Sequence, residues 1–218
     1  MGDVEHYYVE NPKCKKAVYR LKGKFLGVSI DLITMSGMYS PRKIDYGSIV
    51  HLKFARIKPK DKVLDLGCGY GTVGILVKKL YPQTNVTLTD INKRAVDCAK
   101  QNILKNKVNA TVVQGDCFKG VKCGNFDVIL LNPPINAGLK ICYRLIAESF
   151  DCLKLGGSLQ IVIRPRGAGK NLVRKMCSVF GNASRIGSEG IYEVYLAKKE
   201  SSEPASTYDM KKFEKRHE

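Results

Sequence analysis

The chain has 218 residues, of which 44% are hydrophobic and 26% charged, a composition typical of a soluble globular protein with a sizeable core. No apolar run approaches the ~18 residues that a bilayer-crossing helix needs. The N-terminus also lacks the basic start and apolar core of a secretory signal. We therefore expect a cytoplasmic protein with no membrane partner.

Charge is the strongest compositional signal. The formal net charge is +17, and residues 1–62 alone carry 13 basic and 6 acidic side chains. Such an excess favours an anionic partner, and nucleic acid above all. A lysine-rich surface without a specific partner is the simpler alternative.

The eight cysteines do not form a recognisable site. No two of them have the C-x-x-C spacing of a zinc or redox site, and the three histidines do not cluster with them. We expect small buried side chains in a reducing compartment, and no metal.

The first third of the chain predicts a small β extension. Residues 17–35 alternate apolar and polar side chains around two glycines, a pattern typical of short antiparallel strands. A loop follows at 36–43, and residues 46–57 predict a helix that ends before Pro59. We place the boundary of this N-terminal extension at residues 1–45.

Strands and helices then alternate, which indicates a doubly wound α/β sheet with mostly parallel strands. The expected strands are 62–66, 85–90, 110–114, 126–131 and 158–163, and the expected helices are 72–81, 92–106, 139–153 and 168–180. Two last strands, 183–187 and 191–197, have no room for a helix between them and must form an antiparallel hairpin. The main domain is therefore 46–198, and the polar residues 199–218 are expected to form a disordered tail.

A glycine-rich turn follows the first strand of this sheet. In the segment VLDLGCGYG, Gly67, Gly69 and Gly71 allow a tight turn and a close approach of the backbone to a ligand. The next helix starts directly afterwards and offers free N–H groups to an anion. Nineteen residues past Gly71, the second strand ends at Asp90, which is placed to accept hydrogen bonds from two ribose hydroxyls.

The same glycines also fit the dinucleotide pattern G-x-G-x-x-G, but the register disagrees. A dinucleotide loop puts its first glycine directly after the strand, and counting from Gly67 the sixth position is Thr72. Asp65, two residues before the turn, also suits an ammonium group better than a pyrophosphate. A ligand with an amino acid at one end and a nucleoside at the other fits this pattern.

Two more polar groups follow later strands. Asp116 comes after the third strand, where a carboxylate can accept from an adenine amino group, although such a residue is more often a turn or cap aspartate. Asn132-Pro133-Pro134 follows the fourth strand. The carboxyl ends of the strands are where open α/β sheets bind ligands.

In this order, the glycine turn, Asp90, Asp116 and the NPP motif resemble class I S-adenosylmethionine-dependent methyltransferases, whose Rossmann-like seven-stranded sheet ends in a similar hairpin. The stretch SGMYSPRKIDYGS at 36–48 is similar to a segment of the methyltransferase small-domain group, which includes rRNA guanine-N2 methyltransferases. The chain looks most like the short archaeal relatives in that group, and the resemblance covers about residues 5–198.

The resemblance implies a cofactor, S-adenosyl-L-methionine, and a set of residues for each role. Cofactor binding falls to Asp65, Gly67, Cys68, Gly69, Gly71, Asp90, Ile91, Asp116, Cys117 and Asn132. The catalytic residues are Asn132, Pro133 and Pro134, and the substrate-binding residues are Tyr39, Ile135, Arg164 and Arg166.

The NPP motif suits methyl transfer to an aromatic amino nitrogen, whose lone pair is delocalised into the ring that carries it. If the Asn132 side-chain oxygen and the Pro133 carbonyl accept its two hydrogens, the nitrogen becomes more pyramidal and its lone pair is directed. Prolines fix local φ angles and remove competing N–H donors. Ile135 departs from the aromatic residue that commonly follows NPP and stacks on a base. Tyr39 is one candidate to supply that ring.

We therefore expect an enzyme that methylates an exocyclic amino nitrogen, guanine N2 in rRNA or tRNA being the favoured target. Arg164 and Arg166, among glycines after the fifth strand, are candidates for phosphate contacts. One alternative is a protein methyltransferase acting on a glutamine side-chain amide, because the same NPP chemistry serves both. Another is a non-catalytic RNA-binding protein that keeps the fold. The sequence leaves the oligomeric state open.

Overall fold

The computed structural model describes residues 8–205. Its main feature is a seven-stranded sheet in the order β5-β4-β3-β6-β7-β9-β8. Every pair from β5 to β7 is parallel, whereas β9 runs antiparallel to both β7 and β8. The strands of this sheet are β3 (Lys62–Leu66), β4 (Asn85–Asp90), β5 (Thr111–Gln114), β6 (Phe126–Leu131), β7 (Leu153–Ile163), β8 (Ser184–Glu189) and β9 (Tyr192–Lys198). The predicted fold class is thus confirmed.

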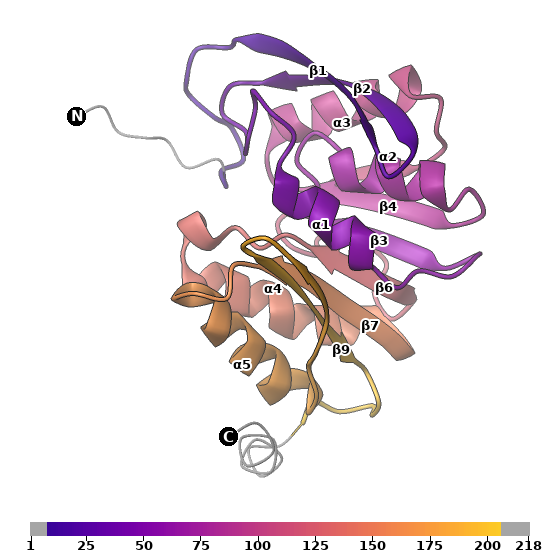
Figure 1. Ribbon diagram of the computed structural model, residues 1–218. Helices are drawn as coiled ribbons and strands as arrows, with labels where there is room; N and C mark the ends of the chain where they lie inside the picture. The colour runs from indigo at the N-terminus through magenta and orange to yellow at the C-terminus, as the bar shows by residue number, and fades with distance from the viewer. Residues whose placement is uncertain (1–7, 206–218) are drawn as a thin grey trace.

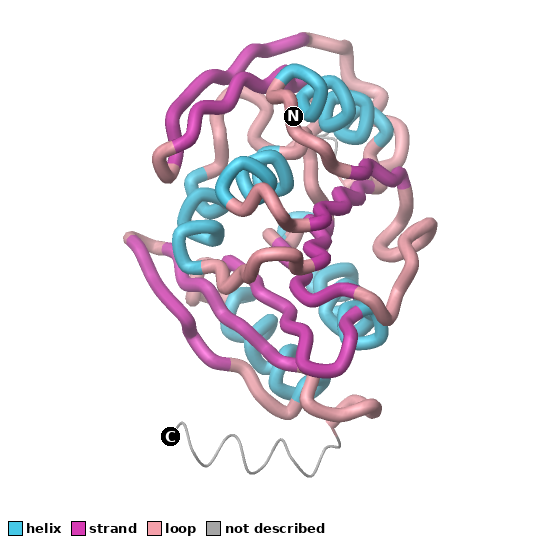
Figure 2. Tube along the Cα trace, turned by 90° about the vertical axis from the view of Figure 1, so that its right-hand side faces the viewer, coloured by secondary structure: helices cyan, strands magenta, loops and turns pink. Residues whose placement is uncertain are grey.

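Helices cover both faces of this sheet, and this arrangement buries the near-continuous apolar runs of β3 and β6. Helices α2 and α3 lie on one side and α4 and α5 on the other (Figure 1), and the turned view shows the strands between helices (Figure 2). The helices are α1 (Tyr46–Phe54), α2 (Thr72–Leu80), α3 (Lys93–Lys105), α4 (Leu139–Cys152) and α5 (Ala168–Phe180), with a short 3₁₀ turn η1 (Ile135–Ala137). Among residues 8–205, no helix has the length and apolar character that crossing a membrane requires.

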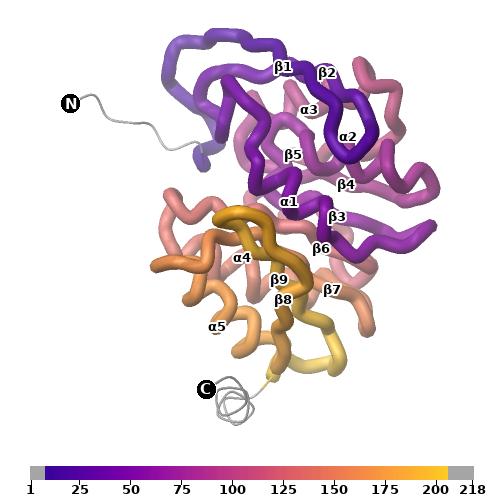
Figure 3. The backbone as a smooth tube through the Cα atoms, in the orientation of Figure 1, coloured from indigo at the N-terminus to yellow at the C-terminus, as the bar shows by residue number. Residues whose placement is uncertain are grey.

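Helix α1 is shorter than the predicted 46–57 and packs against β7 and β9 (Figure 3). The Gln160 side chain explains the early end, because it accepts from the Arg56 backbone N–H at 2.9 Å and donates to the Arg56 carbonyl at 2.8 Å. These bonds hold the chain beside β7 in place of a further helical turn. At the other end, Asp45 caps the helix by accepting from the Ser48 backbone N–H.

The predicted N-terminal strands form a separate two-stranded sheet, β1 (Val18–Phe25) and β2 (Val28–Met35). Two asparagines, one in α3 and one at its C-cap, bind the free edge of β2. Asn102 pairs with both backbone groups of Ile33, and Asn106 pairs with both backbone groups of Asp31. The apolar side chains of β2 join the same buried cluster as α2 and α3. The hairpin is therefore docked on the main sheet's helices, while the division of the chain at residue 45 stays a prediction.

The C-terminal segment differs partly from the expected disordered tail. Lys199 pairs with the backbone of Gly156 and Gly157, and the Ala205 N–H donates to the Val179 carbonyl at 2.9 Å. These contacts place residues 199–205 against the sheet and α5. The rest of the predicted tail, 206–218, lies outside the described residues.

Five described cysteines are buried thiols, as expected from the sequence: Cys68, Cys98, Cys117, Cys142 and Cys177. Cys123 and Cys152 instead form a disulfide between the loop before β6 and the end of α4. The expectation that all eight are unpaired is therefore wrong for this pair. Their sequence spacing carried no pairing signal, because the two meet only where the Gly124 and Asn125 N–H groups bind the Cys152 carbonyl at the end of α4.

Candidate active site

A cavity of about 400 Å³ lies at the carboxyl ends of the parallel strands, where the sequence placed the ligand. Most of the predicted residues line it, from the glycine turn after β3, the ends of β4 and β6, and the loops around them. The predicted residues in its lining are Tyr39, Asp65, Gly67, Cys68, Gly69, Asp90, Ile91, Cys117, Asn132, Pro133, Pro134, Ile135, Arg164 and Arg166. Gly71 and Asp116 do not line it.

The glycine turn leaves open space beside its backbone. Gly67 and Gly69 have φ angles of 71° and 55°, and a Cβ built on either would meet no atom within 4 Å. A ligand can therefore come close to the main chain at both positions. Gly71 has a different role, since it caps α2 in the left-handed conformation, and a Cβ there would press on Leu88 and Ala99. We therefore attribute the glycine at position 71 to the packing of α2 and not to contact with a ligand.

Asp65 is a buried carboxylate at the end of β3. It accepts from the Gly74 N–H in α2 at 2.8 Å, and it forms no salt bridge with any residue of the described chain. Burial raises its pKa to about 7, and the Gly74 bond offsets only part of that rise. A cationic ligand group beside it would favour the charged form. The site therefore fits an ammonium group.

Asp90 ties the glycine turn to the start of α3. One carboxylate oxygen accepts from the Gly69 N–H and the other from the Asn92 N–H, both at 2.8 Å. Burial raises the pKa of Asp90, and these backbone donors oppose the rise. Each carboxylate oxygen has a second acceptor position, so ribose hydroxyls can still bind. Besides its predicted role in cofactor binding, Asp90 thus holds the glycine turn against the start of α3.

Asp116 does not line the cavity, although it contacts two residues that do, Tyr8 and Cys117. Its carboxylate pairs with Arg144 of α4 and accepts from the Tyr8 hydroxyl at 3.2 Å. The predicted contact of this side chain with adenine therefore finds no support in its position. Its neighbour Cys117 lines the cavity instead, together with Tyr8, which the sequence analysis did not include among the site residues.

Arg94 explains how Tyr8 reaches the site. Its guanidinium donates to the carbonyls of Pro12 and Cys14 at 2.6 and 2.8 Å, and the Lys93 N–H donates to the Glu10 carbonyl at 2.9 Å. The segment before β1 is thus fastened to the start of α3. No local motif predicts these guanidinium contacts, which span 82 and 80 residues of sequence.

The two prolines after β6 shape a tight turn. The Ile135 N–H donates to the Pro133 carbonyl at 2.8 Å, and Pro134 between them has φ −77° and ψ 68°, an inverse γ-turn. The Pro133 carbonyl, which was predicted to hold the target nitrogen, therefore already accepts one hydrogen bond within this turn. Its second lone pair is left for a substrate.

Asn132 is fixed by its amide nitrogen. Nδ2 donates to the Asp45 carboxylate at 2.9 Å and to the Ser48 hydroxyl at 3.2 Å. Asn132, Asp45 and Ser48 all line the cavity. The sequence analysis had included neither Asp45 nor Ser48 as site residues, although both belong to the segment quoted for the family resemblance.

The substrate candidates lie at the same cavity. Ile135 and Tyr39 line it, and the Tyr39 hydroxyl donates to Asp45 at 3.0 Å. Arg164 stacks on the ring of Tyr192, with 5.3 Å from its central carbon to the ring centroid, and donates to the Tyr192 hydroxyl. Tyr192 on β9 is a further lining residue without a local sequence signal.

An open, mostly parallel sheet with these groups at the ends of β3, β4 and β6 defines a protein with a methyltransferase fold. The family model "Methyltransferase small domain" matches residues 29–196. The chain belongs to this family.

Relatives and solved structures agree with this assignment. The chain is 31% identical to the uncharacterized protein YbxB of Bacillus subtilis over 89% of this chain and 98% of that protein. It is 32% identical to ribosomal RNA small subunit methyltransferase C of Haemophilus influenzae over 78% of this chain and 52% of that enzyme. It thus spans about half the length of the methyltransferase C relatives.

Among solved structures, the Thermus thermophilus 16S rRNA N2 G1207 methyltransferase in complex with AdoMet and guanosine aligns with a TM-score of 0.76. The alignment has 21% identity and covers 86% of this chain and 52% of that one. A methyltransferase from Pyrococcus furiosus aligns with a TM-score of 0.59 at 24% identity, over 69% and 80% of the two chains. At these identities the alignments establish the shared fold.

Proposed function

We propose that this chain transfers a methyl group from S-adenosyl-L-methionine to an exocyclic amino nitrogen of RNA, with guanine N2 in rRNA as the favoured target. The observation that carries the proposal is the position of Asn132. Its amide nitrogen is bound to Asp45 and Ser48, in the same cavity as the buried carboxylate Asp65 and the partly buried carboxylate Asp90. The methyltransferase C relatives and the aligned enzyme with AdoMet and guanosine support the choice of cofactor and base.

The residues present fit the cofactor. Asp65 suits its ammonium group, because that buried carboxylate has a raised pKa and no cationic partner in the described residues. Gly67 and Gly69 leave room for the close approach of the amino-acid end. Asp90 retains acceptor positions for the ribose hydroxyls. Bound S-adenosylmethionine supplies a sulfonium methyl that is already activated, so the protein has mainly to align the nucleophile.

The chain's own contribution is orientation of the amino nitrogen. Asn132 Oδ1 and the remaining lone pair of the Pro133 carbonyl accept its two hydrogens, which directs the nitrogen lone pair along the line of attack. With the cofactor bound, the C–N bond would form as the S–CH₃ bond breaks, leaving S-adenosylhomocysteine as the neutral thioether and the nitrogen cationic. It then loses a proton to water. The cationic nitrogen is acidic enough to give this proton to water, so the proposed step needs no general base.

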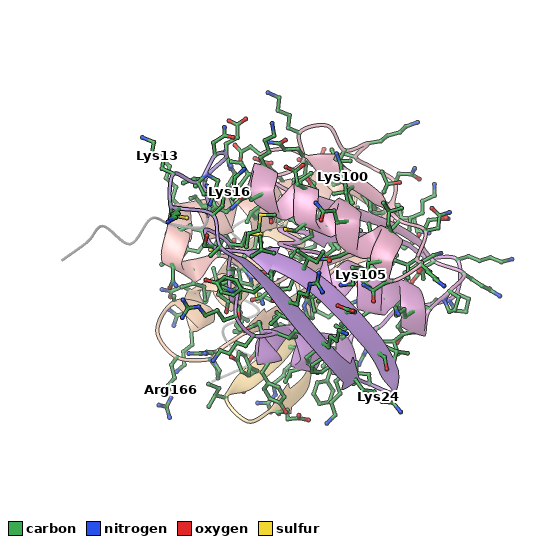
Figure 4. All side chains as sticks on the ribbon, turned by 90° about the horizontal axis from the view of Figure 1, so that it is seen from above. Lys13, Lys16, Lys24, Lys100, Lys105 and Arg166 are labelled. Atoms are coloured by element: carbon green, nitrogen blue, oxygen red, sulfur yellow. A yellow bond between two sulfur atoms is a disulfide. The ribbon has the colours of Figure 1, made fainter. Side chains whose placement is uncertain are left out.

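Surface charge supports RNA as the substrate. Lys13, Lys15 and Lys16 are exposed on the segment before β1, and β1 points Arg20, Lys22 and Lys24 outward. In Figure 4, Lys13, Lys16 and Arg166 extend on one side of the molecule, and Lys24 lies toward the other end of the hairpin. Arg166 lines the cavity. This basic surface therefore begins beside the cavity and follows the hairpin.

The activity is tested with methyl-labelled S-adenosylmethionine, rRNA transcribed in vitro and, separately, a total protein extract. We expect label in the RNA, recovered as N2-methylguanosine by mass spectrometry, and much less label with Asn132→Ala. Label in the protein fraction only would overturn the proposal in favour of a glutamine-amide methyltransferase. Binding to RNA without any transfer would indicate a non-catalytic RNA-binding protein.

RNA binding gives a second test. Each neutralised phosphate releases counterions, so affinity should fall steeply with salt. The slope of the log of the RNA-binding constant against the log of the salt concentration is negative. Changing Lys13, Lys15 and Lys16 together to Gln should reduce its magnitude by about 2–3. The matched control changes three exposed lysines at the opposite end of the sheet, Lys58, Lys60 and Lys62, and should leave the slope near its parental value. Equal effects of the two triple variants would contradict the proposed surface.

A further inference from the structure

The carboxylate of Asp45 lies where Asn132, helix α1 and the loop that carries Tyr39 meet. Asp45 precedes α1, and its Oδ2 accepts from Asn132 Nδ2 at 2.9 Å and from the Ser48 backbone N–H at 2.9 Å. The Ser48 hydroxyl donates to the same oxygen at 3.1 Å, and the Tyr39 hydroxyl donates to Oδ1 at 3.0 Å. Asp45 thus connects α1, the loop before it and the end of β6, which lies 87 residues away in sequence.

We propose that Asp45 is a positioning residue that holds the Asn132 amide with its oxygen toward the target nitrogen. An amide group is nearly symmetric in shape, so packing alone does not decide which of its two ends faces the cavity. A carboxylate only accepts hydrogen bonds, so only the NH₂ end of Asn132 can face Asp45. This role rests on the proposed function, because the amide oxygen matters when the substrate nitrogen carries hydrogens.

Ser48 removes the remaining freedom. Its hydroxyl hydrogen is donated to Asp45, so its oxygen is left to accept from Asn132 at 3.2 Å. Both N–H groups of Asn132 then have fixed acceptors on one side. A flipped amide would place N–H donors against the N–H groups of the substrate, and the carboxylate would face an oxygen. Either mismatch opposes the flipped orientation, which leaves Oδ1 directed to the substrate.

The same carboxylate anchors the substrate side of the cavity. Tyr39 lines the cavity beside Ile135, and its hydroxyl is bound to Oδ1 of Asp45. The orientation of the catalytic amide and the place of this ring therefore depend on one residue. A change that releases Asp45 should reduce turnover through Asn132 and also weaken substrate binding through Tyr39.

Two substitutions separate positioning from folding. Asp45→Ser keeps a good N-cap for α1, but its side chain is too short to reach Asn132. Asp45→Asn keeps an acceptor oxygen for Ser48 and Asn132, and its NH₂ can donate to the Tyr39 hydroxyl. We expect Asp45→Ser to lower kcat on the order of 10- to 100-fold, with S-adenosylmethionine affinity within about twofold of the parent. Asp45→Asn should restore kcat to within about fivefold.

A double variant shows whether Asp45 acts through Asn132. In the Asn132→Ala background, Asp45→Ser should cause no further fall in kcat, because the group it positions is already absent. An additive loss, or an Asp45→Asn enzyme as slow as Asp45→Ser, would overturn the proposal. Urea unfolding of each variant, followed by circular dichroism, identifies any loss that comes from instability.

A third measurement does not depend on the substrate. The side-chain NH₂ resonances of Asn132, assigned from their loss in Asn132→Ala, report its hydrogen bonds directly. They should shift in Asp45→Ser and stay near their parental positions in Asp45→Asn. Unchanged resonances in Asp45→Ser would refute the positioning role even if the enzyme methylates RNA. Shifted resonances in a protein that methylates no RNA would instead refute the proposed function alone.

Discussion

His51 should make the stability of this fold depend on acid pH. It lies in α1 with its side chain fully buried, and neither ring nitrogen has a hydrogen-bond partner among the described residues. Burial lowers its pKa from 6.5 to about 4, and the nearby backbone of Gln160 offsets only part of this effect. The folded protein therefore keeps His51 neutral at a pH where the unfolded chain binds a proton.

The magnitude follows from the two pKa values. Above pH 6.5 the contribution of neutral His51 to the unfolding free energy is fully present, and it is lost progressively as the pH falls toward 4. The whole difference corresponds to about 3.4 kcal/mol of unfolding free energy. Between pH 7.5 and pH 4.5, about 2.5 kcal/mol of this should be lost.

Asp65 complicates the parent curve because it acts in the opposite direction. Its folded pKa of about 7 lies above the value of 3.8 for the unfolded chain. Its contribution is fully present below pH 3.8 and is lost as the pH rises through 7. The parent protein therefore need not show the His51 effect as a net slope. A difference between two proteins that both retain Asp65 isolates it.

The matched variant is His51→Leu, which fills a similar volume without a titratable group. Urea unfolding at pH 7.5 and 4.5 should be followed by circular dichroism, since the chain has no tryptophan to report by fluorescence. The parent should lose about 2.5 kcal/mol more than His51→Leu over this interval. Equal losses in the two proteins would refute the assignment of a buried, neutral His51.

The remaining predictions concern the cavity. Asp90→Ala removes acceptors for two backbone N–H groups, so we expect a loss of about 2–3 kcal/mol in unfolding free energy and of about 1.5–3 kcal/mol in S-adenosylmethionine binding. Unchanged calorimetric affinity would contradict the cofactor role. Asn132→Ala should lower kcat by roughly 10²–10³ with cofactor affinity nearly intact, and parental turnover would overturn the mechanism. Because Tyr39 lines the cavity with Ile135, Ile135→Phe should raise KM by crowding it, and Tyr39→Ala should raise KM as well. If Ile135→Phe instead lowers KM, the Tyr39 ring does not occupy the space beside Ile135.

Local patterns were sufficient to predict the elements of the sheet and the positions of its ligand-binding turns. Hydrophobic periodicity and glycines act within a few residues, so the expected strands 62–66, 85–90 and 126–131 coincide with β3, β4 and β6. The position of Asn132 at the end of a parallel strand followed from the same reasoning. The boundary of α1 did not, because it depends on Gln160, a residue 104 positions away from Arg56.

Contacts between distant segments were decided only by the tertiary structure. Asp116 follows a strand as predicted, yet its carboxylate pairs with Arg144 and Tyr8 and does not line the cavity. Likewise, Asp45 belongs to a recognisable segment, but its bond to Asn132 becomes visible only when α1 packs against β7 and β9. Which polar groups meet depends on the packing of whole helices and strands, a sum of many weak contacts without a local signature. The sequence by itself therefore determined the fold and the chemical groups of the site, and the packing decided their partners.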